Sequence, residues 1–413
     1  MMLQKQLLFF VFLILLTSSC QRKTVPSFNY DYSSINKDIA TLADDAMEGR
    51  EIGTRGEKLA SDYIASRFSA LGLKPSGDPG SYFQTFSRRL NKNPHGEESD
   101  HGAMIEGRNV VAMIDNGAAS SIVIGGHYDH LGYGNEGSLY TGEPAIHNGA
   151  DDNSSGVAGV LSLAENIKKS NLKNYNYVFI CFSGEEKGLW GSNYFVKQSN
   201  PTEFDCMVNM DMIGRLNAEK KLAISGVGTS PDFKKLLESE NGKKFSLKLE
   251  ESGVGPSDHT SFYNAGVPVL AFFTGQHSDY HKPSDDAHLI NYKGIEDIVT
   301  YIFGVVSDLD KMPKLTYVKT KDETKERMSF SVTLGVMPDY LFDGKGMKID
   351  GVKDGKPASV AGMEKGDIVV KMGEMQVVDM QTYMKCLSFF KPGDKVAVKI
   401  IRNGEEMMKD VQF

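Results

Sequence analysis

Residues 121–130 read Ser-Ile-Val-Ile-Gly-Gly-His-Tyr-Asp-His, a short apolar run that ends in two glycines and a group of polar side chains. A run of this length and composition is typical of a buried β-strand. His127 and Asp129 are two residues apart, so their side chains lie on the same side of an extended segment. A nearby carboxylate often sets the tautomer of a histidine that binds a metal ion. Taken alone, this pair is weak evidence for such a site.

Further along the chain, strand-like and helix-like runs alternate. Residues 177–182, 206–210 and 267–273 are apolar and short, which is typical of buried strands. Residues 157–167 and 295–309 have apolar side chains at helical spacing. This alternation predicts an α/β fold with a mixed, mostly parallel sheet sandwiched between helices.

Histidines and acidic residues follow these strands or stand at the start of a helix. In open α/β sheets, ligands bind at the edge where the carboxyl ends of the strands meet. Adjacent acids at the end of a buried strand are costly unless a positive group lies between them, although an acid before a helix can also be a simple cap. Two histidines and several carboxylates at one edge suit zinc or a similar divalent ion. The residues are His127, Asp151, Asp152, Glu185, Glu186, Asp211 and His281.

Residues from about 35 to 309 resemble peptidase family M28, the zinc aminopeptidases. The segment Met47-Glu48-Gly49-Arg50 and the chain that follows it to Pro75 resemble the N-terminal helices of that family. Five further stretches match its motifs in the same order: Gly-His-Tyr-Asp-His, Gly-Ala-Asp-Asp-Asn-Ser-Ser-Gly, Gly-Glu-Glu-Lys-Gly-Leu, Asn-Met-Asp-Met-Ile-Gly and Ser-Asp-His-Thr-Ser-Phe. The resemblance implies a zinc-peptidase-like α/β/α domain and two Zn²⁺ ions per chain.

The resemblance also implies which residues bind the metal ions. His127 and Asp211 would hold one zinc, and Glu186 and His281 would hold the other. Asp152, the second acid of its pair, would bridge the two ions.

Three more residues receive expected roles from the same motifs. Asp129 would orient the histidine ligand that precedes it. Glu185 would be the general base that takes a proton from the attacking water and returns it to the leaving amine. Asp151 would be an acid at a helix start rather than a ligand. His259 has either a structural role or a place in the substrate pocket; the unassigned histidines are His130, His147 and His277.

The expected activity is hydrolysis of the N-terminal bond of peptides that carry a free amino terminus. An M28-like carboxypeptidase or amidohydrolase is an alternative, but residues 88–107, expected to form a polar loop, are too few for the large insertion of many relatives. A glutaminyl cyclase-like acyltransferase would use one metal, which the full ligand set disfavours. A non-catalytic peptide-binding lipoprotein would have no need of a base at Glu185.

Residues 325–413 resemble a bacterial PDZ domain and predict a second, small, mostly β domain. The resemblance lies in residues 332–336, in residues 349–352 and in the glycine-containing stretches of residues 356–369. It implies that Leu334, Gly335 and Val336 form a loop that holds the carboxylate of a C-terminal peptide ligand, with the peptide pairing as an added strand. A domain that only packs against the rest of the chain is the alternative.

The N-terminus resembles a bacterial lipoprotein signal. The apolar run of residues 7–16 is shorter than the roughly 20 residues of a membrane span, and small residues precede Cys20. We expect a signal peptide over residues 1–20, a lipid on Cys20 that anchors the exported protein to a bacterial membrane (in the periplasm or at the cell surface), and a tether over residues 21–34. An ordinary cleaved signal is the alternative. The two domains are expected at residues 35–312 and 325–413.

Composition excludes some partners. The net charge of -8 and the pI of about 5.7 argue against nucleic acid, because a phosphate backbone requires a basic face. Besides Cys20 the chain has Cys181, Cys206 and Cys386. Three cysteines cannot all pair, so we expect no disulfide framework.

Overall fold

The computed structural model describes residues 30–90, 102–320, 331–339, 342, 344–353 and 355–413. The predicted signal peptide, the lipid on Cys20 and most of the predicted tether lie outside these residues. Within them, no helix combines the length and the apolar character that crossing a bilayer requires.

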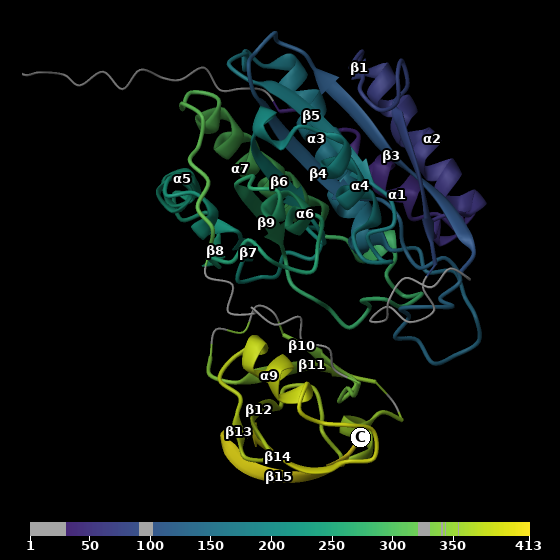
Figure 1. The fold of residues 1–413 in the computed structure, drawn as a ribbon, viewed down its shortest axis with the longest axis vertical. Coiled ribbons are helices and arrows are strands. Elements are labelled where there is room, and N and C mark those ends of the chain that lie inside the picture. Colours follow the sequence, from purple (N-terminus) through teal and green to yellow (C-terminus); the bar gives the residue numbers. More distant parts are fainter. Residues whose placement is uncertain (1–29, 91–101, 321–330, 340–341, 343, 354) are drawn as a thin grey trace, which may run out of the picture. The chain divides into compact units, whose positions relative to one another are not determined.

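The larger domain contains a nine-stranded sheet within the described residues. Its strands follow the order β1-β3-β5-β4-β6-β9-β7-β8, with β2 paired to β3 outside this path. Strands β5, β4, β6 and β9 pair in parallel at the centre, whereas β3 and β7 join them antiparallel. The predicted mixed sheet is confirmed (Figure 1). The strands are β1 Lys74–Pro75, β2 Phe83–Arg89, β3 Met104–Ile114, β4 Ser121–His127, β5 Asn176–Phe182, β6 Phe204–Met210, β7 Lys221–Ser225, β8 Ser246–Leu249 and β9 Val269–Phe273.

Helices cover both faces of this sheet (Figure 1). α3 packs on β4, β5 and β6 and also contacts α1 and α7, whereas α4 and α6 contact each other on the opposite face. This arrangement confirms the predicted sandwich. The helices are α1 Ile35–Leu42, α2 Arg55–Ala70, α3 Gly156–Lys169, α4 Trp190–Gln198, α5 Phe233–Asn241, α6 His259–Asn264 and α7 Tyr292–Leu309.

Strand β5 shows how the central strands are buried on both sides. Ile180 and Phe182 belong to one apolar cluster with Phe262 of α6, and the Phe182 and Phe262 rings lie 6.0 Å apart. Phe179 points to the other face, where its ring lies 6.5 Å from that of Phe68 in α2. A strand buried on both faces has no polar alternation, which is why its sequence is one continuous apolar run.

The expectation of a loop over residues 88–107 is wrong at both ends. β2 continues to Arg89 and β3 begins at Met104, and these two residues are paired in an antiparallel hairpin. The side chains of the outer half of β2 are mostly exposed. A hairpin with one face in solvent can carry polar residues, so polarity alone did not distinguish it from a loop.

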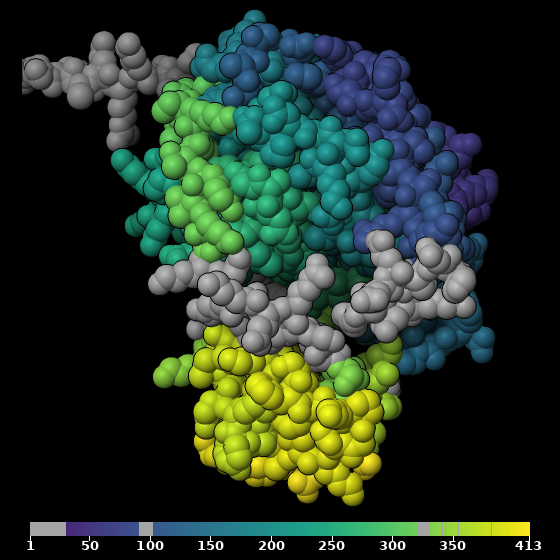
Figure 2. All heavy atoms as spheres, viewed as in Figure 1, coloured from purple at the N-terminus to yellow at the C-terminus, as the bar shows by residue number. Residues whose placement is uncertain are grey.

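The chain after α7 remains part of the larger domain as far as Thr320. Leu315 donates its N–H to Asp205 Oδ1 at 2.7 Å, and Val318 donates its N–H to the carbonyl of Thr229 at 2.8 Å. The Thr320 hydroxyl lies 2.9 Å from that of Tyr263. This light-green segment lies along the surface of the domain (Figure 2).

The C-terminal domain is small and mostly β, as predicted, and consists of an antiparallel sheet with two short helices. Its strand order is β10-β11-β12-β14-β15, with β13 paired to β12. The elements are β10 Val336–Pro338, β11 Met347–Val352, α8 Pro357–Val360, β12 Ile368–Met372, β13 Met375–Gln376, α9 Met380–Leu387, β14 Lys395–Arg402 and β15 Glu405–Gln412.

In the sequence, the short run of residues 330–334 predicts the first strand of this domain, and the structure differs from this prediction over residues 331–334. Residues 331–335 form no strand, and the first strand begins at Val336. Leu334 is buried in the apolar core of the domain. Gly335 has a φ of 72°, which favours glycine. The prediction that Leu334, Gly335 and Val336 bind a peptide carboxylate stays a prediction.

Candidate metal centre

The sheet brings the five predicted ligands to one edge. β4, β5, β6 and β9 run parallel, so their carboxyl ends meet there. His127 is the last residue of β4. Asp152 lies in the turn η2 Ala150–Ser155, which precedes α3. The other three predicted ligands follow strands β5, β6 and β9, respectively: Glu186, Asp211 and His281.

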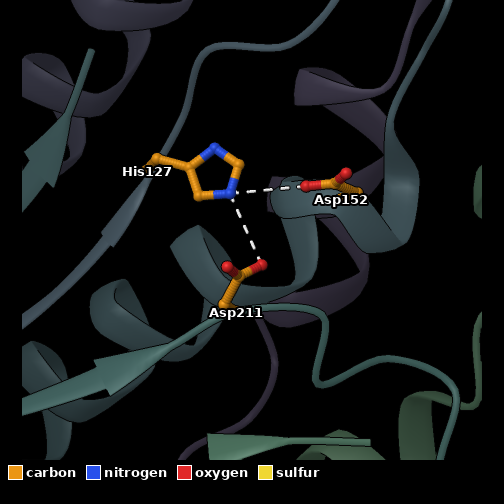
Figure 3. A group of neighbouring side chains, drawn as sticks. All are labelled: His127, Asp152 and Asp211. Atoms are coloured by element: carbon orange, nitrogen blue, oxygen red, sulfur yellow. Dashed lines mark hydrogen bonds and ion pairs between the residues drawn. The ribbon is translucent and has the colours of Figure 1, made fainter. Parts of the chain in front are cut away.

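The first group of ligands surrounds His127. Its Nε2 atom lies 3.3 Å from Asp152 Oδ1 and 3.4 Å from Asp211 Oδ1 (Figure 3). His127 and Asp152 are buried, whereas the Asp211 side chain is 20% exposed. The group is therefore open to solvent on the side of Asp211.

The second group surrounds His281. Its Nε2 atom lies 3.2 Å from Asp152 Oδ2 and 3.3 Å from Glu186 Oε2. The two carboxylate oxygens of Asp152 thus face two different histidines. One aspartate is shared between two groups of possible ligands.

Both groups have the dimensions of a zinc site. Zinc ligands lie about 2.1 Å from the ion in a tetrahedron, which places neighbouring donor atoms about 3.4 Å apart. The four nitrogen–oxygen separations in the two groups are 3.2–3.4 Å. Imidazole nitrogens and carboxylate oxygens are also the donors that zinc accepts, so the residues fit the metal.

His130 is a third histidine at the centre, and the sequence left it unassigned. Its Nδ1 atom lies 2.9 Å from Glu186 Oε1 and 3.9 Å from Asp152 Oδ2. By proximity His130, Asp152 and Glu186 could also hold an ion. The shorter contact is a hydrogen bond, and His281 lies closer to both carboxylates together. We therefore interpret His130 as an orienting partner of Glu186, whose other oxygen faces His281.

Asp129 supports the segment that carries both glutamates. Its carboxylate accepts the N–H of Glu185 at 3.1 Å and that of Glu186 at 3.4 Å. Its Oδ1 atom is 3.7 Å from Nδ1 of His127, and its main-chain oxygen is nearer to that nitrogen, at 3.2 Å. Burial raises the pKa of Asp129 to about 8.

Glu185 lies inside the same cluster of charges. Burial raises the pKa of Glu185 well above its ordinary value; His127 opposes this shift, and the carboxylates of Glu186 and Asp258 add to it. In the described part of the chain no hydrogen bond engages its carboxylate. A carboxylate in this position can exchange a proton with a bound molecule.

Asp151 is engaged elsewhere. Its Oδ1 atom accepts the N–H of Gly214 at 2.6 Å and the hydroxyl of Ser155 at 3.0 Å. Its Oδ2 atom lies 3.2 Å from Nε2 of His277. Asp285, whose role the sequence did not reveal, accepts the N–H groups of both Asp151 and Asp152, at 2.9 and 3.0 Å.

A loop clamps His281 from two sides. Nδ1 of His281 lies 2.9 Å from the carbonyl of Gly137, and the N–H of Leu139 donates to the carbonyl of His281 at 2.9 Å. Between them, the Ser138 hydroxyl lies 2.7 Å from Nε2 of His147. The nitrogen of His281 that faces the carboxylates is thereby set by main-chain contacts that no short motif announces.

His259 is buried beside Asp258 at the start of α6. Neither of its ring nitrogens has a hydrogen-bond partner among the described residues, and burial lowers its pKa to about 4. Burial raises the pKa of Asp258 to about 7. That His259 has either a structural role or a place in the substrate pocket stays a prediction.

Two glycines allow the ligand segments to approach each other. A Cβ atom at Gly126 would lie 2.5 Å from the carbonyl of Met210, which precedes Asp211. Gly149 has a φ of 54°, and a Cβ atom there would lie 2.1 Å from the carbonyl of Asp152. Any larger residue would push the ends of β4, β6 and η2 apart.

Residues 109–306, which include this edge of the sheet, match the family model of peptidase family M28. The chain carries a peptidase family M28 domain. Residues 318–412 match the model of the PDZ domain, so a PDZ domain follows the M28 domain. The resemblances to peptidase family M28 and to a PDZ domain are confirmed.

Relatives of the M28 domain include aminopeptidases. Leupeptin-inactivating enzyme 1 of Streptomyces exfoliatus is 28% identical over 253 residues, which are 60% of this chain and 49% of that protein. A probable leucine aminopeptidase of Arthroderma otae is 27% identical over 223 residues, 50% of this chain and 58% of that protein. The chain thus spans about half the length of these curated relatives.

Solved structures share the fold of the M28 domain. The zinc aminopeptidase BSAP of Bacillus subtilis has a TM-score of 0.55 at 17% identity and covers 70% of this chain and 98% of its own. The glutaminyl cyclase of Porphyromonas gingivalis also has a TM-score of 0.55, at 15% identity, over 68% of this chain and 99% of its own. Solved structures with this fold therefore include both a zinc aminopeptidase and a glutaminyl cyclase.

Proposed function

We propose that this chain is a two-zinc aminopeptidase that hydrolyses the N-terminal bond of peptides. The observation that carries the proposal is the position of Asp152, whose two oxygens face His127 and His281 at 3.3 and 3.2 Å. A carboxylate shared in this way suits a bridge between two ions. His127 and Asp211 would hold one ion, and Glu186 and His281 the other.

The zinc ions, when bound, would polarise the substrate carbonyl and make water more acidic. Glu185 then acts as the general base: it takes a proton from the attacking water and delivers it to the leaving amine. Asp129 positions Glu185 by accepting its N–H.

Names of the relatives support an exopeptidase that acts on free N-termini. Several of them are named aminopeptidases, among them those of Arthroderma otae and Bacillus subtilis. Asp211 is the most exposed of the five proposed ligands, so a chain end would approach the centre from its side. The substrate would be a peptide with a free amino terminus.

An assay with blocked and free substrates tests this function. The full-length chain is incubated with aminoacyl-nitroanilides and with the same compounds acetylated at the N-terminus. We expect release of nitroaniline from the free compounds alone, its loss with a chelator, and its recovery with Zn²⁺. Equal cleavage of the blocked compounds, or activity that survives complete metal removal, would contradict the proposal.

Two further substrates separate the alternatives. A peptide with N-terminal glutamine tests for cyclisation, the reaction expected if the chain acts as the glutaminyl cyclase of the same fold does. A peptide blocked at the N-terminus and free at the C-terminus tests for a carboxypeptidase. We expect neither to react, and metal analysis should give two zinc ions per chain rather than one.

The partners outside the centre are also proposals. The PDZ domain would bind the C-terminus of a peptide at Leu334, Gly335 and Val336. Lipid on Cys20 would hold the protein at a bacterial membrane. A Cys20→Ser variant that still sediments with membranes would contradict the lipid anchor.

A further inference from the structure

Arg50 is a buried arginine outside the predicted ligand set. Its side chain is 1% exposed. Burial lowers its pKa to about 10, while the charges of Asp152, Asp129 and Asp285 act in the opposite direction. Buried arginines are usually paired with a carboxylate, but no carboxylate among the described residues forms an ion pair with Arg50.

The guanidinium group of Arg50 instead donates four hydrogen bonds to main-chain carbonyls. Nε donates to Tyr128 at 2.7 Å. Nη1 donates to Leu42 at 2.5 Å and to Asn148 at 2.6 Å, and Nη2 donates to Gly149 at 3.0 Å. One rigid, planar group therefore joins three segments of the chain.

Two of these segments carry the centre. Tyr128 stands between His127 and Asp129, and Gly149 immediately precedes the turn η2 that holds Asp152. The third segment is the end of α1. The main chain of Gly49 and Arg50 adds two bonds, since His130 donates its N–H to the carbonyl of Arg50 at 3.3 Å and Gly132 donates to that of Gly49 at 2.9 Å.

We propose that Arg50 is a positioning residue of the metal centre. By bonding Tyr128, Asn148 and Gly149 at once, it sets the separation of His127 from Asp152 and so the affinity of the centre for its ions. The inference rests on the proposed function only in requiring that the centre binds metal.

Charge and geometry give opposite expectations for a neutral residue such as glutamine at this position. A cation close to the centre repels incoming zinc, so charge alone would make any neutral replacement bind zinc more tightly. Lysine keeps the charge but loses the planar fork that reaches four acceptors. If Arg50 acts through geometry, lysine and glutamine both weaken binding.

The test measures zinc affinity by competition with a chromophoric chelator, on the metal-free full-length chain. Arg50→Lys and Arg50→Gln should each weaken zinc binding about tenfold or more, the effect typical of groups that support metal ligands. At saturating zinc, the activity of these variants should be closer to the wild-type value than their zinc affinity is, because the ligands themselves are intact.

Arg67→Lys is the matched control. Arg67 lies in α2 and bonds both oxygens of the buried Asp38, at 2.7 and 2.9 Å, but contacts no ligand segment. The Arg67→Lys substitution should lower the melting temperature of the metal-free chain and leave its zinc affinity unchanged. Wild-type affinity in Arg50→Lys, or an equal loss in Arg67→Lys, would overturn the inference. A wild-type chain that binds no zinc overturns the proposed function, and this inference with it.

Hydrogen exchange on the wild-type chain supplies a second measurement if the Arg50 variants do not fold. Coupling between sites is reciprocal, so zinc should slow amide exchange in residues 42–50, outside the ligand segments themselves. Strands β14 and β15 of the PDZ domain serve as the reference and should not change. Unchanged exchange over residues 42–50 would also overturn the inference.

Discussion

At the scale of single residues, Asp151 and Asp152 have the same side chain and different surroundings. The oxygens of Asp152 lie 3.2–3.3 Å from His281 and His127. Those of Asp151 are engaged by Gly214, Ser155 and His277. The turn η2 gives the two carboxylates their different directions, so the same substitution should have different effects at each.

We expect Asp152→Asn to lower the zinc content below two ions per chain and to abolish most of the activity, because an amide cannot bridge two cations. Asp151→Asn should retain the zinc but lower the free energy of unfolding by about 1–3 kcal/mol, since a buried network loses an acceptor. Metal analysis and urea unfolding of both variants measure the two effects. Equal zinc loss in the two variants would refute our choice of the bridge.

Glu185 provides the second prediction at this scale. Glu185→Gln should retain both zinc ions and lower kcat by about 10²–10⁴-fold, because the proton carrier is lost while the ligands survive. Steady-state kinetics and metal analysis of the variant check this. Glu136→Gln is the control, because the Glu136 side chain is 55% exposed and pairs with Lys187; this variant should retain the wild-type activity. A kcat of the Glu185→Gln variant within tenfold of the wild-type value would contradict the role of Glu185 as the general base.

At the scale of elements, Asn153 joins the ends of β4 and β6 to the start of α3. Its side-chain nitrogen donates to the carbonyls of His127 and Met210, at 3.3 and 3.0 Å. Its side-chain oxygen accepts the N–H groups of Gly156 and Met212, at 3.0 and 3.1 Å. Asn153 therefore connects three elements of the centre.

Asn153→Asp should lower the free energy of unfolding by about 2–4 kcal/mol, because two donors are replaced by a carboxylate oxygen facing two buried carbonyls. Urea unfolding of the metal-free chain measures this. Asn200→Asp is the matched control, since Asn200 caps a short exposed turn by accepting from Thr202, and aspartate caps equally well. Similar stability losses in both variants would contradict the role of Asn153.

Elements were predicted well where burial leaves a strong pattern. β4, β5 and β6 are buried along their whole length, so each reads as a mainly apolar run without regular polar alternation. The hairpin ends near Arg89 and Met104 were expected to be loop, because their exposed faces carry polar side chains. β15, with mostly exposed residues, gave no comparable signal and was not predicted.

At the scale of the whole molecule, the length of the M28 domain can be tested by truncation. A chain ending at Thr320 keeps the bonds from Leu315 and Val318 and the contact between Thr320 and Tyr263, whereas one ending at Met312 loses them. The longer form should have the higher melting temperature. It should also retain activity on small aminoacyl substrates, because the proposed ligands and base all lie before it.

Comparison of the truncated chain with the full-length chain then tests whether the PDZ domain helps to bind longer substrates. If that domain holds longer substrates, its removal raises KM for long peptides and leaves the nitroanilides nearly unaffected, because contacts remote from the scissile bond are lost. Kinetics on a dipeptide and on a long peptide distinguish this result from a general loss. Equal losses on both substrates would contradict a substrate-holding role.

The sequence by itself determined the sheet, the two domains and the residue types at the edge where the carboxyl ends of the parallel strands meet. Continuous apolar runs followed by histidines and acids are local patterns, and the order of five motifs identified the family. Only the tertiary structure decided which atoms meet: that the two oxygens of Asp152 face two different histidines, that His130 bonds Glu186, and that Arg50 bonds both segments that carry the proposed ligands. The reason is physical, because hydrogen bonds to main-chain carbonyls depend on where distant segments lie, and such contacts leave no mark in residue spacing.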